Sequence, residues 1–413
     1  MCAGGALGTI LDLGRLPLAN GLTTEAQLLE PESRYPLVLV FCPECALVQI
    51  TETLPPEALY RQYVYFSSYS DTMLREARQM AQRMVWSRPL SGKSRVVEIA
   101  SNDGYLLQFY KQAGIEILGI EPARNVADIA IERGIPTICA FFSRELAREL
   151  SAQDKQADVI HANNVLAHVA DLDGFLGGLV LLLKRSGVIV IEVPYVKDLI
   201  ESVEFDTIYH EHLYYFSLTA LKTVCGRQAL AITAVEHLTT HGGSLRIFLE
   251  HAPSGVRVHR SVSQMLSEEV RCGLNAFSYY EDLSAKVDRL QECLLEQLRT
   301  LKSQGLRIAG YGASAKGATL LNHFGIGKDI LDFIVDRNPA KQGLYAPGTH
   351  LPIYGVEKLM EAMPDYVLLL TWNFAAEILE QQSEYRRRGG RFIVPIPEVR
   401  VIGRDPASTG PRS

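Results

Sequence analysis

Short apolar strands alternate with amphipathic helices along this chain, and no other feature restricts its fold as strongly. Residues 94–114, SRVVEIASNDGYLLQFYKQAG, read as a strand, a glycine-containing turn and a helix. Residues 115–134 and 157–193 repeat that order. Strands that alternate with helices predict a doubly wound, parallel sheet. A second strand–turn–helix series begins at residue 306, so the fold class is α/β with two such domains.

The chain divides into three predicted parts. Residues 1–56 are rich in Gly, Leu and Pro and form a small module with too little core to stand alone. Residues 57–250 hold the first α/β domain. Residues 251–413 hold a helical linker, with a long amphipathic helix over 279–305, and the second α/β domain.

Composition excludes several classes of protein. The net charge of −6 argues against a nucleic-acid surface, which needs a basic face. The most apolar stretch is interrupted by Lys184, Arg185 and Gly187, so it predicts a helix, a turn and a strand, not a membrane span. No signal peptide is visible at the start. Seven cysteines, an odd number, do not suggest a disulfide framework. We expect a cytoplasmic protein, monomeric or weakly dimeric.

The turn of the first α/β domain, from Glu98 to Gly104, does not match G-x-G-x-x-G. An acidic strand end followed by small residues suits a ligand that carries a cation. Glu121 ends the next strand and can accept both ribose hydroxyls of an adenosine. Together they predict an S-adenosylmethionine site; an ordinary turn with a solvated glutamate is the alternative. The candidate cofactor-binding residues are Glu98, Ala100, Asn102, Asp103, Gly104, Glu121, Pro122 and Asn163.

The turn of the second α/β domain does match G-x-G-x-x-A, from Gly310 to Ala315. Asp336 stands where a ribose-binding acid would, so this turn alone predicts NAD and a dehydrogenase. The motif is weakly specific, because it supplies backbone N–H groups and a helix N-terminus for any phosphate. Gly312 and Lys316 would hold the diphosphate of a sugar nucleotide equally well.

Cysteines in the N-terminal module have the spacing of a metal knuckle. Cys42 and Cys45 form a C-x-x-C pair, which suits tetrahedral zinc, and Cys2 is the third candidate ligand. Two unligated cysteines in a turn are the alternative.

Two polar stretches remain to be explained. IYHEHLYYFS, residues 208–217, places histidines and a carboxylate in an apolar frame. They could be metal ligands, a general base with its orienting carboxylate, or packed polar residues. HANNVLAHV, residues 161–169, follows a strand at the ligand edge of the sheet. Asn164 and His168 share a face if this stretch is helical; capping by Asn164 and a surface His168 are the alternative.

At this point the chain resembles a known family, the bacterial sugar C-methyltransferases of antibiotic deoxysugar biosynthesis. The resemblance covers nearly the whole chain. It rests on DLGRLPLAN, FCPECALVQI, YVYFSSYSDTML, VVEIASNDGYLL, GIEPARNVA, IYHEHLYYFS, GYGASAKG, DRNPAKQGLYAPGTHLPI and LTWNFAAEI, in that order. It implies an N-terminal zinc module, a class I methyltransferase domain and a Rossmann-like C-terminal domain that helps to bind the nucleotide sugar. Relatives open with a C-x-x-C knuckle, of which Cys2 resembles the second cysteine, so the first would precede Met1.

The resemblance also implies a reaction and roles for residues. The substrate would be a thymidine diphosphate (TDP)-linked 4-keto-6-deoxy sugar, methylated at carbon 3 or, less often, carbon 5; we expect carbon 3. His212 would be the base, with Glu211 and Tyr209 supporting it. His168 and Asn164 would lie near the sugar, and Tyr63 or Tyr65 would contact the substrate from a lid. A nicotinamide enzyme and a non-catalytic nucleotide-sugar binder are the competing classes.

Overall fold

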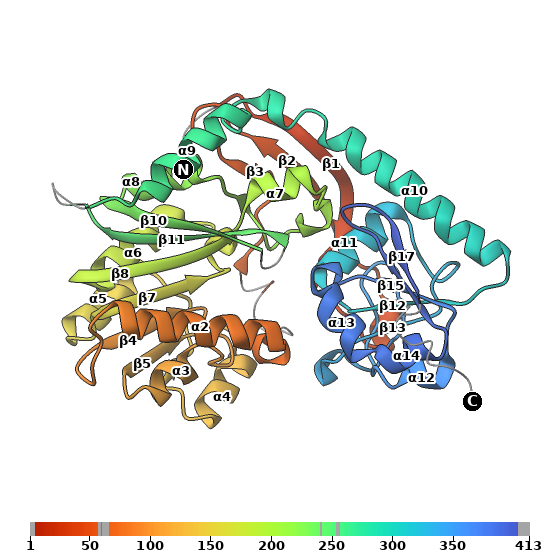
Figure 1. The fold of residues 1–413 in the computed structure, drawn as a ribbon, viewed down its shortest axis with the longest axis horizontal. Coiled ribbons are helices and arrows are strands. Elements are labelled where there is room, and N and C mark those ends of the chain that lie inside the picture. The colour runs from red at the N-terminus through yellow and green to blue at the C-terminus, as the bar shows by residue number, and fades with distance from the viewer. Residues whose placement is uncertain (1–4, 57–58, 60–65, 240–241, 253–256, 404–413) are drawn as a thin grey trace, which may run out of the picture.

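Three β-sheets form the framework of the protein in the computed structural model, which describes residues 5–56, 59, 66–239, 242–252 and 257–403 (Figure 1). The N-terminal module is built on a four-stranded sheet, the central domain on a seven-stranded sheet and the C-terminal domain on a six-stranded sheet. The predicted α/β fold, with two Rossmann-like domains and a small N-terminal module, is confirmed.

The central sheet has the strand order β10-β11-β8-β7-β4-β5-β6, in which β11 alone runs antiparallel to its neighbours. Winding reverses at β4, and this order is that of the class I methyltransferase fold. The strands are β4 (Arg95–Ile99), β5 (Glu116–Ile120), β6 (Thr137–Ile138), β7 (Ala157–Asn163), β8 (Leu183–Pro194), β10 (Leu230–Leu238) and β11 (Ser244–His251).

Helices cover both faces of the central sheet, because its strands are apolar on both faces. Val96 faces the core that contains α2 and α3, whereas the next residue, Val97, faces the core that contains α5, α6 and α8. Ser70 caps α2 by accepting a hydrogen bond from the Met73 N–H. The helices are α2 (Asp71–Ser87), α3 (Leu107–Gln112), α4 (Arg124–Glu132), α5 (Arg144–Ala152), α6 (Leu172–Leu182), α7 (Val196–Glu201) and α8 (Leu218–Gly226).

The C-terminal sheet is parallel except for its last strand and has the order β14-β13-β12-β15-β16-β17. Its winding reverses between β12 and β15, so it has a switch point of its own. Its strands are β12 (Ile308–Tyr311), β13 (Ile334–Val335), β14 (Ile353–Tyr354), β15 (Tyr366–Leu369), β16 (Arg391–Val394) and β17 (Arg400–Ile402). Its helices are α11 (Ala315–Phe324), α12 (Lys358–Ala362), α13 (Ala375–Gln381) and α14 (Ser383–Arg387).

The N-terminal sheet borrows a strand from the central domain. Its order is β1-β2-β3-β9, with β1 (Gly8–Pro17), β2 (Arg34–Phe41), β3 (Val48–Ile50) and β9 (Tyr214–Tyr215). β3 pairs with β9 in antiparallel register, with Val48 opposite Tyr215. The predicted boundary at residue 56 therefore separates strands of one sheet. The segment that follows His210, Glu211 and His212, hereafter the HEH motif, completes the small core of this module.

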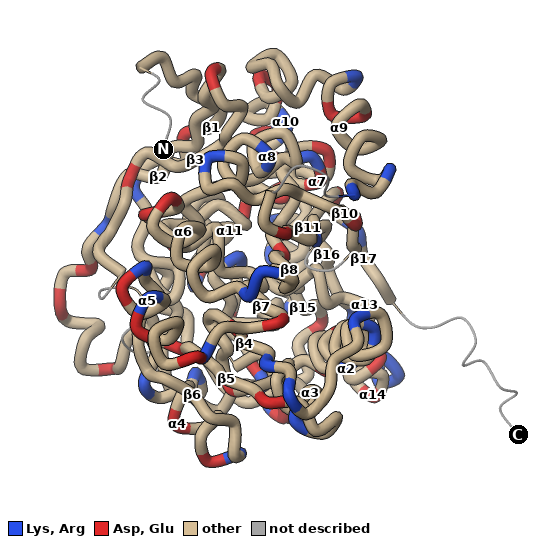
Figure 2. Tube along the Cα trace, turned by 90° about the vertical axis from the view of Figure 1, so that its left-hand side faces the viewer, with Lys and Arg blue, Asp and Glu red and all other residues tan. Residues whose placement is uncertain are grey.

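Two helices connect the central and C-terminal domains. α9 (Arg260–Cys272) lies near the edge of the central sheet, and α10 (Leu283–Ser303) runs past β1 toward the C-terminal domain (Figure 1). The apolar stripe of α10 is buried and consists of Leu283, Val287, Leu290, Leu294, Leu298 and Leu301. No helix within the described ranges has both the length and the apolar character of a membrane span. Acidic and basic positions are interspersed along the trace (Figure 2).

Gly104 offers a test of the cofactor turn. Its φ is +80°, and a Cβ atom there would lie 2.7 Å from Ile135 Cγ1. We expect Gly104→Ala to lower the free energy of unfolding by about 2 kcal/mol or more, from backbone strain and overpacking together. Gly114→Ala is the matched control, because Gly114 has φ +72° but no atom within 4 Å of the added Cβ. Urea denaturation compares the two; equal losses would contradict the contact with Ile135.

Candidate active site

The turn after β4 lies at the reversal point of the central sheet, the position at which such sheets bind ligands. Ala100 and Asn102 have φ values of 56° and 51°. A non-glycine residue in this left-handed region costs on the order of 1–3 kcal/mol, and such strain concentrates at functional sites. This turn therefore combines backbone strain with a place at the edge of the sheet where ligands bind in such folds.

Buried polar atoms without partners gather at this turn. Within the described part of the chain, no hydrogen-bond partner is found for Glu98 Oε2, Ser101 Oγ, Asp103 Oδ1 or Asn163 Oδ1. Glu98 is only 1% exposed. Burial raises its pKa well above the ordinary value, and the carboxylates of Asp103 and Glu121 raise it further. Tyr105 forms a side-chain hydrogen bond with Glu98, so the atoms without partners are single oxygens of these side chains. Because buried polar atoms without partners are costly, a cationic ligand such as the ammonium or sulfonium of S-adenosylmethionine would stabilise this cluster.

Glu121 follows β5 and ties the turn to the neighbouring strand. Its carboxylate accepts hydrogen bonds from the backbone N–H of Asn102 at 3.0 Å and of Ala123 at 2.9 Å. Burial raises its pKa to about 7, although these two hydrogen bonds act in the opposite direction. The carboxylate thus stands beside the predicted ribose position, with Pro122 next to it in the chain.

The segment before α2 covers the cofactor turn. The Ser67 N–H donates to Asn102 Oδ1 at 2.8 Å, and the Ser68 hydroxyl donates to Asp103 Oδ2. Arg133 forms an ion pair with the same carboxylate at 2.9 Å. Tyr63 and Tyr65, the predicted lid tyrosines, lie outside the described residues.

The HEH motif, His210 to His212, forms a tight turn. The His212 N–H donates to the Tyr209 carbonyl at 2.9 Å. The turn follows a 3-10 helix, η4 (Phe205–Thr207), and leads directly into β9. The central domain and the N-terminal sheet therefore hold its two ends.

The His212 ring has defined partners on both nitrogens. Nδ1 lies 2.9 Å from the Thr207 carbonyl, and Nε2 lies 2.8 Å from the Tyr209 hydroxyl. Because a carbonyl can only accept, Nδ1 carries the proton and the Tyr209 hydroxyl donates to Nε2. The Thr207 carbonyl and the Tyr209 hydroxyl thus hold the two ring nitrogens, and the expected support of His212 by Glu211 stays a prediction.

Glu211 instead joins the turn to the N-terminal module. Asn20 Nδ2 donates to Glu211 Oε1 at 2.7 Å, across 191 residues of sequence. Burial raises the pKa of this carboxyl to about 7, while the Asn20 hydrogen bond and the nearby Lys341 lower it. Lys341 is itself buried and donates to the Ala313 carbonyl at 2.7 Å. Residues of all three domains thus meet at Glu211.

His168 lies beside His212. Their ring centroids are 4.8 Å apart, in an edge-to-face arrangement. Burial lowers the pKa of His168 to about 4, against the effect of hydrogen bonds to the backbone of Glu211 and Asn164. Only a short 3-10 helix, η3 (Leu166–His168), forms here, and Asn164 has a φ of 53°. The conditional expectation that Asn164 and His168 share an α-helical face is therefore wrong.

His210 has a structural environment. It is 1% exposed, and Nε2 lies 3.1 Å from the Pro36 carbonyl and 3.3 Å from the Tyr35 carbonyl of β2. The alternating histidines of the motif thus separate, with His212 toward His168 and His210 toward the N-terminal sheet.

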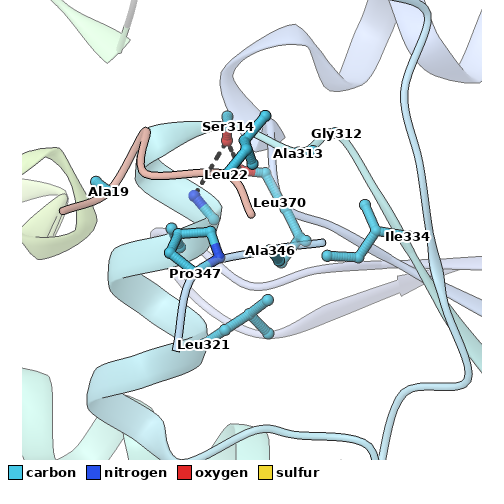
Figure 3. Close-up of a pocket in the computed structure, with 12 residues that line it drawn as sticks. Ala19, Leu22, Gly312, Ala313, Ser314, Leu321, Ile334, Ala346, Pro347 and Leu370 are labelled. Atoms are coloured by element: carbon cyan, nitrogen blue, oxygen red, sulfur yellow. Dashed lines mark hydrogen bonds between the residues drawn. The ribbon is translucent and has the colours of Figure 1, made fainter. Parts of the chain in front are cut away.

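The glycine turn of the C-terminal domain is closely covered. Figure 3 shows Ala19 and Leu22 of the N-terminal module facing the Gly312–Ser314 turn. The cavity between them has a volume of about 10 Å³, roughly the space of one water molecule. Ser314 caps α11 by accepting from the Gly317 N–H at 3.0 Å. Lys316 Nζ lies 4.5 Å from the centroid of the Trp372 ring.

Asp336 of the C-terminal domain repeats the geometry of Glu121. Its carboxylate accepts from the Ala313 N–H at 2.8 Å and from the Asn338 N–H at 2.8 Å. In each domain, an acidic residue follows the second strand of the series. Its carboxylate accepts one backbone N–H from the first turn and one from the residue two positions after the acid itself. The central turn has unpaired polar atoms beside this acid, whereas the C-terminal turn has the apolar cover of Ala19 and Leu22.

The cysteine knuckle is formed as a turn between β2 and β3. The Ala46 N–H donates to the Cys42 carbonyl and the Cys42 N–H to the Leu47 carbonyl, each at 2.9 Å. Cys42 and Cys45 are buried. Cys2 lies outside the described residues. Among the residues that are described, no group of three or more His, Cys, Asp or Glu side chains could hold a metal ion.

Sequence reasoning missed Asn20 and Thr207 as contacts of the site. Asn20 ends the DLGRLPLAN stretch, and that position in a recognised segment is the only signal it carries. Thr207 acts through its backbone carbonyl, which no side-chain pattern can indicate.

Comparisons with known proteins agree with this geometry. Residues 1–60 match the family "Putative zinc binding domain", residues 66–235 match "Methyltransferase domain" and residues 239–397 match "C-methyltransferase C-terminal domain". C-methyltransferase NovU of Streptomyces niveus is 35% identical over 393 residues, which are 95% of this chain and 94% of NovU. The chain belongs to the C-methyltransferase family. It is an S-adenosylmethionine-dependent methyltransferase.

More distant similarities are confined to part of the chain. A ubiquinone biosynthesis O-methyltransferase of Rhodopseudomonas palustris (strain HaA2) is 26% identical over 98 residues, 24% of this chain and 38% of that protein. The solved structure of magnesium protoporphyrin IX methyltransferase from Synechocystis PCC 6803 is 13% identical and has a TM-score of 0.33, covering 43% of this chain and 78% of that one. The class I strand order described above carries the fold assignment for this C-methyltransferase.

The assignment of Glu121 to the ribose is open to test. Glu121→Gln removes the charge and should weaken binding of S-adenosylhomocysteine roughly 10- to 150-fold, the equivalent of about 1.5–3 kcal/mol for a charged hydrogen bond. Isothermal titration calorimetry measures it. Asp336→Asn is the matched control, because Asp336 holds the same two-N–H bridge in the other domain and should leave this affinity unchanged. Equal affinity in Glu121→Gln and wild type would refute the assignment.

Proposed function

We propose that this enzyme methylates a TDP-linked 4-keto-6-deoxy sugar at carbon 3, next to the keto group. One observation carries the proposal. The hydrogen-bonded His212–Tyr209 pair lies in a partly buried turn. The pairing of β3 with β9, the Asn20–Glu211 hydrogen bond and a hydrogen bond from Trp372 to Asp206 hold this turn in place. The similarity to NovU, named a C-methyltransferase, supports transfer to carbon. Carbon 5, which also flanks the keto group, is the alternative position.

Methylation at such a carbon needs its proton to be removed. S-adenosylmethionine supplies an electrophilic methyl group. The base must be neutral at working pH, and its acceptor nitrogen must point at the proton. With Nδ1–H held by the Thr207 carbonyl, the lone pair of His212 is on Nε2. We propose that His212 takes the proton at Nε2, leaving an enolate whose carbon would accept the methyl group, while the carbon–sulfur bond of the sulfonium would break to leave a neutral thioether.

Tyr209 marks the position from which the proton comes. Its hydroxyl donates to Nε2 at 2.8 Å, so the acidic carbon must either replace this hydroxyl or use it as a relay. Both routes keep the proton on the path to Nε2. The supporting role proposed for Tyr209 therefore rests on direct contact with the base.

His168 is a weaker candidate for the base. A histidine whose pKa burial lowers to about 4 is a poor proton acceptor at neutral pH. We propose that it stays neutral and faces the keto group of the sugar together with Asn164. The edge of its ring against His212 would help to exclude water from the base.

The remaining substrate contacts are also proposals. Tyr63 and Tyr65 would contact the sugar from the segment before α2. Lys316 would attract the diphosphate, with Gly312 beside it; the apolar cover of Ala19 and Leu22 would have to shift for direct contact with the Gly312 turn.

His212→Ala should slow exchange of the substrate proton by roughly 10²- to 10⁴-fold, the usual contribution of a positioned base. Proton NMR of TDP-4-keto-6-deoxyglucose in deuterated buffer, without cofactor, measures the rate and shows which carbon exchanges. Loss of signal at carbon 3 is the expected result, and exchange confined to carbon 5 would reassign the methylated carbon.

His168→Ala is the matched comparison for this experiment, because His210 packs on β2 and its loss would disturb the fold. We expect the His168 variant to retain most of its exchange, and S-adenosylhomocysteine to bind both variants. Normal exchange in His212→Ala with loss in His168→Ala would transfer the role of base to His168.

The N-terminal module should hold a structural zinc, which we propose to be bound by Cys42, Cys45 and Cys2. Cys42→Ser should lower the zinc content, measured by plasma emission spectrometry, and the unfolding temperature with it, because a structural metal contributes directly to folding. Cys293→Ser, at an exposed position on α10, is the control. A wild-type protein that is fully stable without zinc would contradict the proposal.

A further inference from the structure

A buried hydrogen bond joins the C-terminal domain to the segment that precedes the HEH turn. Trp372, at the start of the 3-10 helix η8 (Trp372–Phe374), donates from Nε1 to Asp206 Oδ2 at 2.7 Å, across 166 residues of sequence. Asp206 is fully buried and Trp372 is 8% exposed. Bonds to charged groups are stronger than neutral ones and fix geometry more tightly.

Opposing influences act on the Asp206 carboxyl, and burial is the largest of them, so its pKa lies above the ordinary value. Burial raises the pKa of Asp206, whereas Lys316, the Trp372 hydrogen bond and the backbone N–H groups of Asp206 and Thr207 lower it. Lys316 lies over the Trp372 ring at 4.5 Å. The indole thus has a cation on its face and a carboxyl group at its N–H. Asp206 directly precedes Thr207 within η4.

Thr207 is also the residue that holds the base. Its carbonyl accepts from His212 Nδ1 at 2.9 Å and from the Tyr215 hydroxyl at 3.4 Å. One turn of chain therefore connects the indole of Trp372 to the imidazole of His212. Phe205 reinforces the connection, because its ring stacks on Phe324 of α11 with a centroid distance of 4.8 Å.

We propose that Trp372 is a positioning residue for the base: its N–H holds the side chain of Asp206, Asp206 is joined directly to Thr207 within η4, and the Thr207 carbonyl sets the orientation and tautomer of His212. This inference rests on the proposed role of His212. It assigns to the C-terminal domain a part in proton removal, in addition to any contact with the nucleotide. A small displacement of a catalytic group is enough to cost a large factor in rate.

Trp372→Phe tests the proposal with the smallest change, because it keeps an aromatic ring beside Lys316 and removes the N–H. We expect kcat and the rate of substrate proton exchange to fall by about 10- to 100-fold. The KM for TDP-4-keto-6-deoxyglucose and the affinity for S-adenosylhomocysteine should remain within about twofold. Nitrogen-15 NMR of histidine-labelled protein should show the His212 ring as the Nδ1–H tautomer in wild type and as a mixture in the variant.

Trp86→Phe is the matched control, because Trp86 is the other tryptophan of the chain and is 89% exposed at the end of α2. Asp206→Asn, which retains an oxygen acceptor for the indole, should lose less activity than Asp206→Ala. Adding Trp372→Phe to Asp206→Ala should cause little further loss of activity, because each change alone already removes the Trp372–Asp206 hydrogen bond.

Two results would overturn the inference. One is a Trp372→Phe enzyme with normal kcat and exchange; the other is an unchanged tautomer with loss confined to the unfolding temperature, which indicates an anchor alone. The proposed function fails separately, and does so if His212→Ala leaves exchange intact. Exchange lost in His212→Ala but normal in Trp372→Phe would remove only the role of Trp372.

Discussion

The pairing of β3 with β9 is the contact on which the active site depends. β9 has two residues, and it begins two residues after His212. Its register places Val48 opposite Tyr215, and the Ile50 N–H donates to the Leu213 carbonyl at 3.0 Å. Backbone hydrogen bonds therefore fix one end of the HEH turn, while η4 fixes the other. A histidine in an unsupported loop would sample many orientations, and this one is restrained from both sides.

The two Rossmann-like domains share one hydrogen-bonding arrangement but differ in the residues that surround it. Glu121 and Asp336 each accept two backbone N–H groups and so set the shape of the first turn. Around Glu121, buried polar atoms of Glu98, Ser101 and Asp103 lack hydrogen-bond partners. Around Asp336, apolar residues of the N-terminal module occupy the equivalent place. Fold and turn motif are alike, so the difference in chemistry comes from what surrounds each turn.

Local pattern was enough to predict much of this protein. Alternating strands and helices predicted the α/β fold with two Rossmann-like domains, whereas the cofactor roles of Glu98 and Glu121 stay predictions. The contacts that define the site could not be predicted in this way. Asn20–Glu211 and Trp372–Asp206 join residues 191 and 166 positions apart, and the partner of His212 Nδ1 is a carbonyl. Such contacts depend on how the domains pack against one another. The periodic pattern of apolar residues along the chain carries no information about that packing.

The α10 helix has a mechanical consequence. Its 21 residues span about 30 Å, and its buried side recurs from Leu283 to Leu301. A helix packed along its whole length behaves as a strut: it resists stretching and bending, because either would expose the leucine stripe to water at about 25 cal/mol per Å². The distance between the two Rossmann-like domains is therefore nearly fixed. Any opening between them would be a rotation about the ends of α10; beyond its C-terminal end, Gly305 has a positive φ.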